Sequence, residues 1–277
     1  MSLKNKAKET LEILDQGGFD SPEGKWIDLS SQLKDAIAGS KTYVPEQFTQ
    51  LTEPINQGDT TPVFEVTTET TQIAAGRLSD EGCENIVLLN FASARNPGGG
   101  FLNGAKAQEE DLARCSGLFY CLRSQMDYYD ANRKQSSMLY TDHVIYSPKV
   151  PWFRVRSRDQ PDRLFTASVI TAPAPNATQA RRRDYSEKDI EGALYRRCGQ
   201  VLGVARDNNH RVLLLGAWGC GVFGNKPAMV ANSFYQWLTG DVFRGAFDRV
   251  VFAIYDRTKD KKVYGAFAEQ FQSQNSY

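Results

Sequence analysis

The sequence has few residues of the kinds that build disulfide-linked or metal-centred proteins. Its 277 residues include five cysteines and two histidines. The cysteines are odd in number, and no two of them are spaced as Cys-x-x-Cys. We therefore expect neither a disulfide framework nor a zinc site, and no other bound metal.

Long hydrophobic runs and an excess of charge of one sign are missing as well. No apolar stretch of 18 residues occurs, and residues 1–6 form no apolar signal core, so we expect a cytoplasmic protein without membrane association. Lys and Arg total 33, and Asp and Glu also total 33. A chain without net charge has no overall field that attracts a polyanion, so we expect no direct DNA binding and expect anionic ligands to be bound by local groups.

Linkers, repeats and low-complexity segments are also absent, and helix-like and strand-like segments alternate. This alternation is typical of a layered α/β fold, here one domain over residues 1–277. Expected helices cover residues 4–16, 33–38, 70–78, 186–206 and 262–271, with another opening at Pro227. Expected strands cover residues 26–29, 61–67, 85–92, 164–171, 211–215 and 249–255, and the weaker signal at 127–160 indicates a loop around Tyr128 followed by a strand.

The most informative segment is a run of three glycines followed by acidic residues. Gly98, Gly99 and Gly100 follow the expected strand at 85–92, at the sheet edge where open α/β folds bind ligands. Glu109, Glu110 and Asp111 open a helix whose apolar positions extend as far as Leu122. Glycines that admit a close ligand, beside a group of carboxylates, indicate an active site.

A second glycine-rich loop, at 216–225, follows the expected strand at 211–215. Two loops of this kind can aim backbone N–H groups at a diphosphate, although tight turns are the commoner reason for an isolated glycine-rich loop. The spacing Gly219-x-Gly221-x-x-Gly224 formally matches a dinucleotide fingerprint with Asp241 as its acid, but the match comes too late in the chain. A phosphate P-loop at 100–106 fails because Ala107 stands where Ser or Thr is needed.

Glu109 and Glu110 project about 100° apart on a helix, so their roles should differ. A helix N-terminus lowers a carboxyl pKa, whereas a general acid needs a raised one, so burial, the neighbouring acid or bound phosphates must oppose the dipole. Such a pair suits glycosidic cleavage. The alternative is that these acids only complement the helix dipole.

The arrangement of Gly98-Gly99-Gly100, seven residues and then Gln108-Glu109-Glu110 resembles the signature of poly(ADP-ribose) glycohydrolases. The 219–224 loop resembles the phosphate-binding loop of that family, and Asn90-Phe91-Ala92 resembles the macrodomain strand that enters the ligand cleft. The resemblance implies a three-layer α/β/α macrodomain-like fold with a mixed central sheet, and residues 1 to about 60 as an N-terminal extension packed on the core.

The resemblance also implies an activity and a set of site residues. The substrate would be poly(ADP-ribose) or ADP-ribosylated proteins and the product ADP-ribose, in reversal of ADP-ribosylation such as that of the DNA damage response, by a monomer without a cofactor. Glu110 would be the general acid/base, and Glu109 would orient ribose hydroxyls. The implied substrate-binding residues are Asn90, Ala92, Gly98, Gly99, Gly100, Asn103, Gln108, Gly219, Gly221, Val222, Phe223, Gly224 and Asn225.

Two other functions remain open at this point: a macrodomain that binds ADP-ribose without cleaving it, and a hydrolase of mono-ADP-ribosyl conjugates. The arginines at 154, 156, 158 and 181–183 are expected at the solvated surface. Cys220 is expected in packing, since it has no apparent histidine partner. The adenine could stack on Tyr128, Tyr129, Tyr140 or Tyr146, and the sequence does not select among them.

Overall fold

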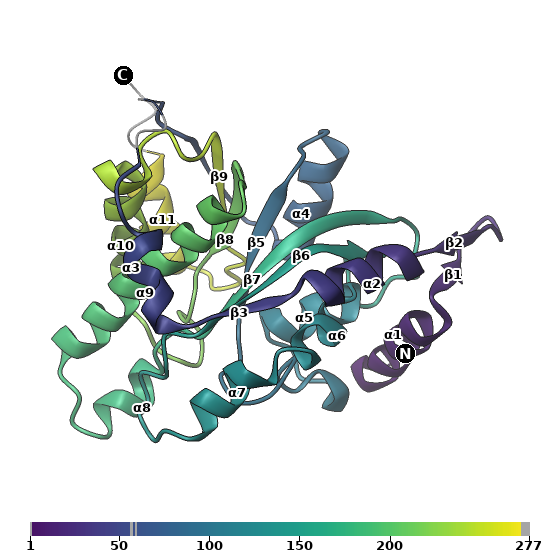
Figure 1. The fold of residues 1–277 in the computed structure, drawn as a ribbon, viewed down its shortest axis with the longest axis horizontal. Helices are drawn as coiled ribbons and strands as arrows, with labels where there is room; N and C mark the ends of the chain where they lie inside the picture. Colours follow the sequence, from purple (N-terminus) through teal and green to yellow (C-terminus); the bar gives the residue numbers. More distant parts are fainter. Residues whose placement is uncertain (1, 56–57, 59, 273–277) are drawn as a thin grey trace.

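The structure, a computed structural model, describes residues 2–55, 58 and 60–272, and within them a mixed sheet of seven strands forms the centre (Figure 1). The strands are β3 (Lys41–Tyr43), β4 (Val63–Thr67), β5 (Ile86–Phe91), β6 (Val144–Trp152), β7 (Phe165–Ala172), β8 (Val212–Gly216) and β9 (Arg249–Ala253). They lie in the order β3-β6-β7-β5-β8-β9-β4. β7, β5, β8, β9 and β4 are parallel to one another, whereas β6 is antiparallel to both of its neighbours.

Helices cover both faces of this sheet (Figure 1). One face carries α3 (Phe48–Leu51), α9 (Glu187–Asp207), α10 (Pro227–Thr239) and α11 (Lys262–Phe271). The other carries α2 (Ser30–Gly39), α4 (Thr71–Asp80), α5 (Gln108–Cys115), α6 (Leu118–Arg123) and α7 (Met126–Arg133). The expected three-layer α/β/α fold with a mixed sheet is confirmed.

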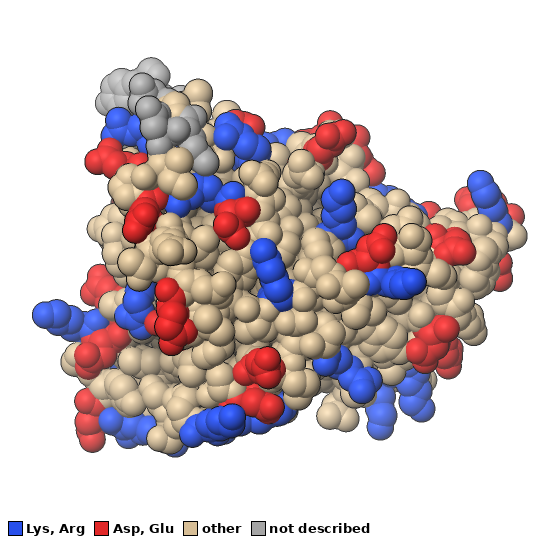
Figure 2. Space-filling view, in the orientation of Figure 1, with Lys and Arg blue, Asp and Glu red and all other residues tan. Residues whose placement is uncertain are grey.

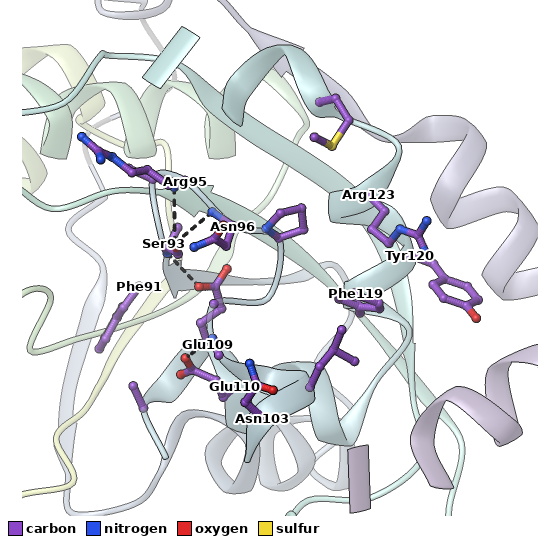
Figure 3. A pocket seen from close by; sticks show the side chains of 18 of the residues that line it. Phe91, Ser93, Arg95, Asn96, Asn103, Glu109, Glu110, Phe119, Tyr120 and Arg123 are labelled. Atoms are coloured by element: carbon purple, nitrogen blue, oxygen red, sulfur yellow. Dashed lines mark hydrogen bonds between the residues drawn. The ribbon is translucent and has the colours of Figure 1, made fainter. Parts of the chain in front are cut away.

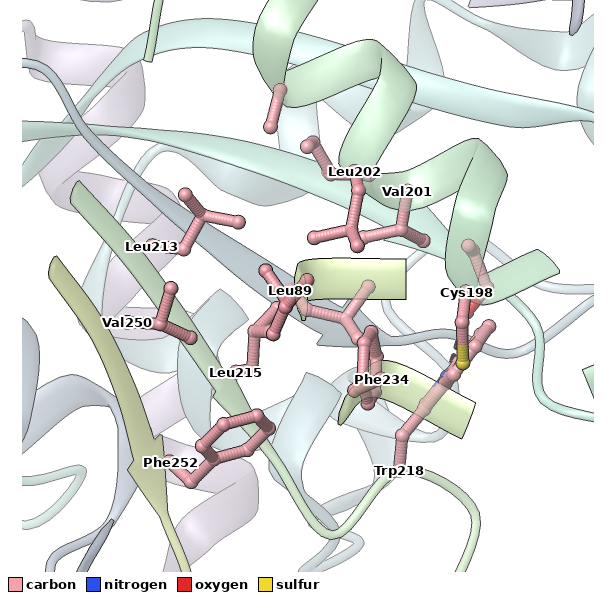
Figure 4. Close-up of a cluster of buried hydrophobic side chains, with 14 of the residues drawn as sticks. Leu89, Cys198, Val201, Leu202, Leu213, Leu215, Trp218, Phe234, Val250 and Phe252 are labelled. Carbon is pink, nitrogen blue, oxygen red and sulfur yellow. Dashed lines mark hydrogen bonds between the residues drawn. The ribbon is translucent and has the colours of Figure 1, made fainter. Parts of the chain in front are cut away.

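The central strands are apolar on both faces, because each face is covered by helices. In β5, Val87 and Leu89 belong to one hydrophobic cluster, while Ile86 and Leu88 belong to the other. Figure 4 shows the first cluster, in which Leu89 and strand residues of β8 and β9 pack against Val201 and Leu202 of α9 and Phe234 of α10. This packing fixes the sheet whose edge carries the site.

The N-terminal segment begins with α1 (Leu3–Gln16), which ends at Gly17 with a φ of 76° and was predicted as a helix at 4–16. A small hairpin of β1 (Gly18–Asp20) and β2 (Trp26–Asp28) follows. β3 then joins the main sheet at its edge, so part of the expected extension belongs to the sheet itself. The short 3₁₀ helix η1 (Pro45–Gln47) leads from β3 into α3.

One buried arginine anchors α1 to the core. Arg154 has 0% exposure, so the prediction that it lies at the surface is wrong, whereas Arg156 and Arg158 are exposed. Its guanidinium lies 5.1 Å from the centroid of the Phe153 ring and pairs with Glu9 of α1 at 3.4 Å. Thr10, also in α1, donates a 2.9 Å hydrogen bond to the carbonyl of Arg114 in α5.

The prediction of one helix from Glu109 to Leu122 is wrong. α5 ends at Cys115, Ser116 is extended and bridges to Trp152, and α6 starts at Leu118. Gly117 sits where a β-carbon would lie 2.7 Å from Leu33, so packing between separate segments sets this break. The apolar spacing continues across the break because both helices face the same core.

Two further predictions differ from the structure. Tyr128 and Tyr129, expected in a loop, lie in α7 with 0% exposure and form an edge-to-face pair with ring centroids 4.7 Å apart. The last strand ends at Ala253, two residues earlier than expected. Both tyrosines are buried by contacts from other segments, which the local sequence does not reveal.

Charged residues of both signs are interspersed over the face shown in Figure 2. This pattern agrees with the equal numbers of basic and acidic residues in the sequence. Among the described residues, no helix is both long enough and apolar enough to span a membrane.

Candidate active site

A cleft of about 1240 Å³ opens at the carboxyl ends of the parallel strands (Figure 3). The loop after β5 forms most of its wall, and the rest comes from α1, α6, the first residues of α5 and α7, the loop before β6 and the loop after β8. Predicted residues that line it are Ala92, Gly99, Gly100, Asn103, Glu109, Glu110 and Phe223. The sheet therefore brings the two glycine-rich loops, more than 100 residues apart in the sequence, to one edge.

Gly99 packs against both catalytic-site carboxyl groups. Its φ is 57°, and a β-carbon there would lie 2.4 Å from Oε1 of Glu110 and 3.1 Å from Oε2 of Glu109. Gly98 has a φ of 67°, and a β-carbon there would lie 3.0 Å from the ring of Phe119. The sequence suggests that these glycines admit a ligand, and the structure shows that they also make room for the protein's own acids and aromatic ring.

Glu109 is held at both carboxyl oxygens. The backbone N–H of Ser93 donates to Oε2 at 2.7 Å, and the amide of Asn90 donates to Oε1 at 3.3 Å. The side chain is 2% exposed, and burial, with a smaller contribution from the charge of Glu110, raises the pKa of Glu109 to about 8 against those hydrogen bonds. At this position the effect of burial on the pKa outweighs that of the hydrogen bonds from Ser93 and Asn90.

Glu110 is held at only one oxygen. The backbone N–H of Gly100 donates to Oε1 at 2.8 Å. Oε2 is buried, and it has no hydrogen-bond partner in the part of the chain that the structure describes. Glu110 is thus a positioned carboxyl group at the wall of the cleft, with one oxygen that no hydrogen bond from the described residues holds (Figure 3).

Gln108 connects the start of α5 to the end of β5. Its Oε1 accepts the backbone N–H of Phe91 at 2.8 Å, and its Nε2 donates to the carbonyl of Leu89 at 2.8 Å and to Thr71 at 3.2 Å. Asn90 is fully buried. Both residues support the neighbouring acids, and neither of them lines the cleft.

The loop after β8 contributes Phe223 to the cleft, 6.0 Å from the ring of Tyr140. The loop is held from outside: Thr178 donates its N–H to the carbonyl of Phe223 at 2.9 Å, and Arg181 donates to the carbonyl of Gly224 at 3.1 Å. Arg181, predicted as solvated surface, lies in the short helix α8 (Ala177–Arg181) and is only partly exposed.

The other predicted residues of this loop do not line the main cleft. Asn225 is buried, and its amide donates to the carbonyls of Pro175 at 2.9 Å and Gly219 at 3.2 Å. Gly219 and Gly224 have φ values of 71° and 68° at the turns. Val222 is 93% exposed and lines neither this cleft nor the cavity beside it.

Gly221 borders a second cavity, of about 310 Å³, which shares Phe91 with the main cleft. Thr70, Tyr255 and Asp256 also line it. Tyr255, 59% exposed, was missed in the sequence because it lies inside the predicted strand at 249–255. β9 ends two residues earlier, and this turns Tyr255 into a cavity residue.

The structure selects among the remaining candidates. Of the four tyrosines considered for adenine stacking, only Tyr140 lines the cleft, and the other three are buried. Burial raises the pKa of the Cys220 thiol to about 12, which disfavours the thiolate needed for nucleophilic attack. Within the described residues, no group of three or more His, Cys, Asp or Glu side chains could hold a metal ion.

Several cleft residues gave no signal in the sequence. They come from α1, α6, the start of α7 and the loop after β5: Leu11, Asp15, Ser93, Arg95, Asn96, Phe119, Tyr120, Arg123 and Met126. Phe119 was predicted as a core position of a long helix. The break before α6 is what brings the residues of that helix to the cleft.

Comparisons with known proteins point to one family. Residues 7–155 match the family model described as microbial-type PARG, catalytic domain. A crystal structure of poly(ADP-ribose) glycohydrolase from Thermomonospora curvata has a TM-score of 0.93 and 41% identity, and the match covers 97% of this chain and 99% of that one. A search of the curated proteins found no match.

Two ligand complexes are also similar. The Thermomonospora curvata enzyme bound to the inhibitor ADP-HPD has a TM-score of 0.89 and 42% identity, with coverage of 97% of this chain and 99% of that one. The Deinococcus radiodurans poly(ADP-ribose) glycohydrolase in complex with ADP-ribose has a TM-score of 0.79 and 44% identity, with coverage of 87% of this chain and 97% of that one.

Proposed function

The chain belongs to the microbial-type poly(ADP-ribose) glycohydrolase family, and we propose that it hydrolyses the ribose–ribose O-glycosidic bonds of poly(ADP-ribose) and releases ADP-ribose. The complexes of its relatives with ADP-ribose and with ADP-HPD support an ADP-ribose unit as the group bound in the cleft. The observation that carries the mechanism is the difference between two adjacent acids: Glu109 is bound at both oxygens, and Glu110 at one.

In this mechanism Glu110 moves the proton. Its Oε2 donates a proton to the leaving ribose oxygen as the bond from that oxygen to the anomeric carbon breaks. The resulting carboxylate then takes a proton from the water whose oxygen attacks the anomeric carbon, which returns Glu110 to its starting state. The hydrogen bond from Gly100 keeps the carboxyl group in place through both steps.

Glu109 orients the substrate and stores a proton beside Glu110. Its pKa of about 8 means that it is mostly protonated at neutral pH. The negative charge of Glu110 adds to the effect of burial and favours the protonated form of Glu109. The carboxyl group of Glu109 also lies where it can contact hydroxyls of the ribose whose bond is cleaved, since it lines the cleft next to Gly99.

The two glycine-rich loops form the seat for the ADP-ribose unit, and Gln108 and the buried Asn90 and Asn225 support them. The backbone of the 219–224 loop faces the diphosphate, and Phe223 packs on the ribose next to Glu110. Because the second cavity shares Phe91 with the cleft and borders the same loop at Gly221, the adenosine half extends into it and Tyr255 is within reach of the adenine. We assign the enzyme to the cytoplasm as a monomer, with residues 1–277 as one domain.

The test is hydrolysis of purified poly(ADP-ribose) by the intact chain, read out as released ADP-ribose. Glu110→Gln should lower the rate by roughly 10²–10⁴-fold, the usual contribution of a general acid/base. ADP-ribose binding by the same variant should remain. Full activity of Glu110→Gln would show that Glu110 is not the general acid/base. Binding of ADP-ribose without turnover by the unaltered chain would show that the protein binds ADP-ribose and does not cleave the polymer.

A second substrate distinguishes hydrolysis of the polymer from removal of single ADP-ribose units. ADP-ribose should be released much more slowly from a mono-ADP-ribosylated protein than from the polymer at the same concentration. Equal or faster release of the single unit would assign the chain to hydrolases of mono-ADP-ribosyl conjugates.

A further inference from the structure

One end of the cleft lies beyond Glu109 and Glu110, on the side away from Phe91. Asp15 of α1 and Phe119, Tyr120, Arg123 and Met126 in or next to α6 line this part, which we call the α6 end. In Figure 3, Phe91 lies on one side of Glu109 and Glu110, and Tyr120 and Arg123 lie on the other. Phe91 packs in the same cluster as Phe223, so the diphosphate loop is on the Phe91 side.

We propose that the α6 end binds the ADP-ribose unit that remains in the polymer, the one whose adenosine ribose carries the leaving oxygen. This inference rests on the proposed function, because it assumes that the scissile bond lies at Glu110. The bond joins two ADP-ribose units, so seating one unit toward Phe223 sends the other across Glu110 toward α6. The cleft, at about 1240 Å³, exceeds the 300–1000 Å³ that usually holds one ligand.

The side chains of the α6 end match the chemistry of such a unit. Arg123 is exposed, its guanidinium lies 5.8 Å from the centroid of the Phe119 ring, and no acid in the described part of the chain forms an ion pair with it. A guanidinium in this state suits a diphosphate. Tyr120 and the partly exposed Met126 offer flat and apolar surfaces to an adenine.

The α6 end is also built before substrate arrives. The hydroxyl of Tyr120 donates to the carboxylate of Asp15, which ties α1 to α6. The Phe119 ring is packed on Phe101, with centroids 5.1 Å apart. The Asp15 carboxylate disfavours phosphate at its own position and accepts hydrogen bonds from ribose hydroxyls or the adenine amino group, so the diphosphate is expected at Arg123.

Binding measurements with one and with two units test this proposal. In the full chain carrying Glu110→Gln, which prevents turnover, calorimetric titration compares ADP-ribose with a dimer of two ADP-ribose units joined by the ribose–ribose bond. The dimer should bind roughly tenfold more tightly than ADP-ribose, and adding Arg123→Ala should remove most of this difference while ADP-ribose affinity stays within about twofold.

Arg133→Ala is the matched control. Arg133 lies at the end of α7, its side chain is 41% exposed, and it does not line the cleft. It should change neither affinity. Equal affinity for dimer and monomer, or equal effects of Arg123→Ala on both ligands, would overturn the assignment of the α6 end while leaving the proposed function intact. A chain that fails to bind ADP-ribose at all would overturn the proposed function itself.

Discussion

Gly99 and Glu110 are packed so closely that a β-carbon on the glycine would lie 2.4 Å from the Oε1 atom of the acid. The acid in turn is fixed by the N–H of the next glycine, Gly100. The glycine run and the carboxylate pair are therefore one structural unit. A side chain at position 99 would therefore displace the carboxyl group of Glu110.

Gly99→Ala should abolish most of the activity. The added methyl group displaces the carboxyl group of Glu110 and also strains a backbone with a φ of 57°. We expect a loss of at least about 10²-fold in kcat, because a displacement on the order of 1 Å at the reacting group has that effect. The measurement is steady-state release of ADP-ribose, with circular dichroism to check the fold.

Gly192→Ala provides the control for that variant. Gly192 lies inside α9, and nothing lies within 4 Å of a β-carbon added there. Alanine in a helix interior should raise the free energy of unfolding by about 0.5–1 kcal/mol and leave activity unchanged. Near-normal activity of Gly99→Ala would show that the loop and Glu110 shift without consequence, contrary to the proposed mechanism.

The activity should fall at alkaline pH. Glu109 has a pKa of about 8, so above this pH it loses its proton and places a negative charge beside Glu110 and the substrate hydroxyls that it orients. We expect kcat/KM for polymer to decline about tenfold per pH unit above pH 8. The profile is measured at constant ionic strength, and a rate that stays constant to pH 10 would contradict proton storage at Glu109.

The stability should depend on pH through the same residue. An unfolded glutamate has a pKa of about 4.3, so the folded chain binds more protons than the unfolded chain between about pH 4.3 and pH 8. The contribution of Glu109 to the free energy of unfolding is therefore complete below pH 4.3 and is lost as the pH rises toward 8. Its full size is on the order of a few kcal/mol.

Glu109→Gln isolates this contribution, because glutamine keeps the shape and does not ionise. Urea denaturation at pH 5 and pH 8 should show a larger decrease in stability for the unaltered chain than for the variant. Identical decreases in both proteins would mean that the proton uptake belongs to another group.

Tyr255→Ala should weaken ADP-ribose binding by roughly tenfold, since stacking of a base on an aromatic ring contributes about 1–3 kcal/mol. The effect should fall on KM and on the dissociation constant rather than on kcat, because Tyr255 lies in the second cavity and away from Glu110. Trp26→Ala is the control, since Trp26 is 47% exposed on β2 and lines neither cavity. Unchanged affinity in Tyr255→Ala would move the adenine elsewhere, with Tyr140 as the next residue to test.

Local patterns predicted much of the fold. The apolar strand before Gly98, the helix at 4–16 that ends at Gly17 and the capped helix starting at Ser186 are all present, because each depends on neighbours in the sequence. The break between α5 and α6 could not be predicted in this way. It depends on the pairing of Ser116 with Trp152 and on the packing of Gly117 against Leu33.

The sequence by itself determined the layered fold, the two glycine-rich loops and the identity of the acids at the start of α5, because backbone conformation and hydrophobic periodicity are local properties. Only the tertiary structure decided how those acids differ. Burial raises the pKa of Glu109, while Oε2 of Glu110 has no hydrogen-bond partner among the described residues. It also decided that α1 and α6 complete the cleft, because which surfaces meet depends on the packing of segments far apart in the chain.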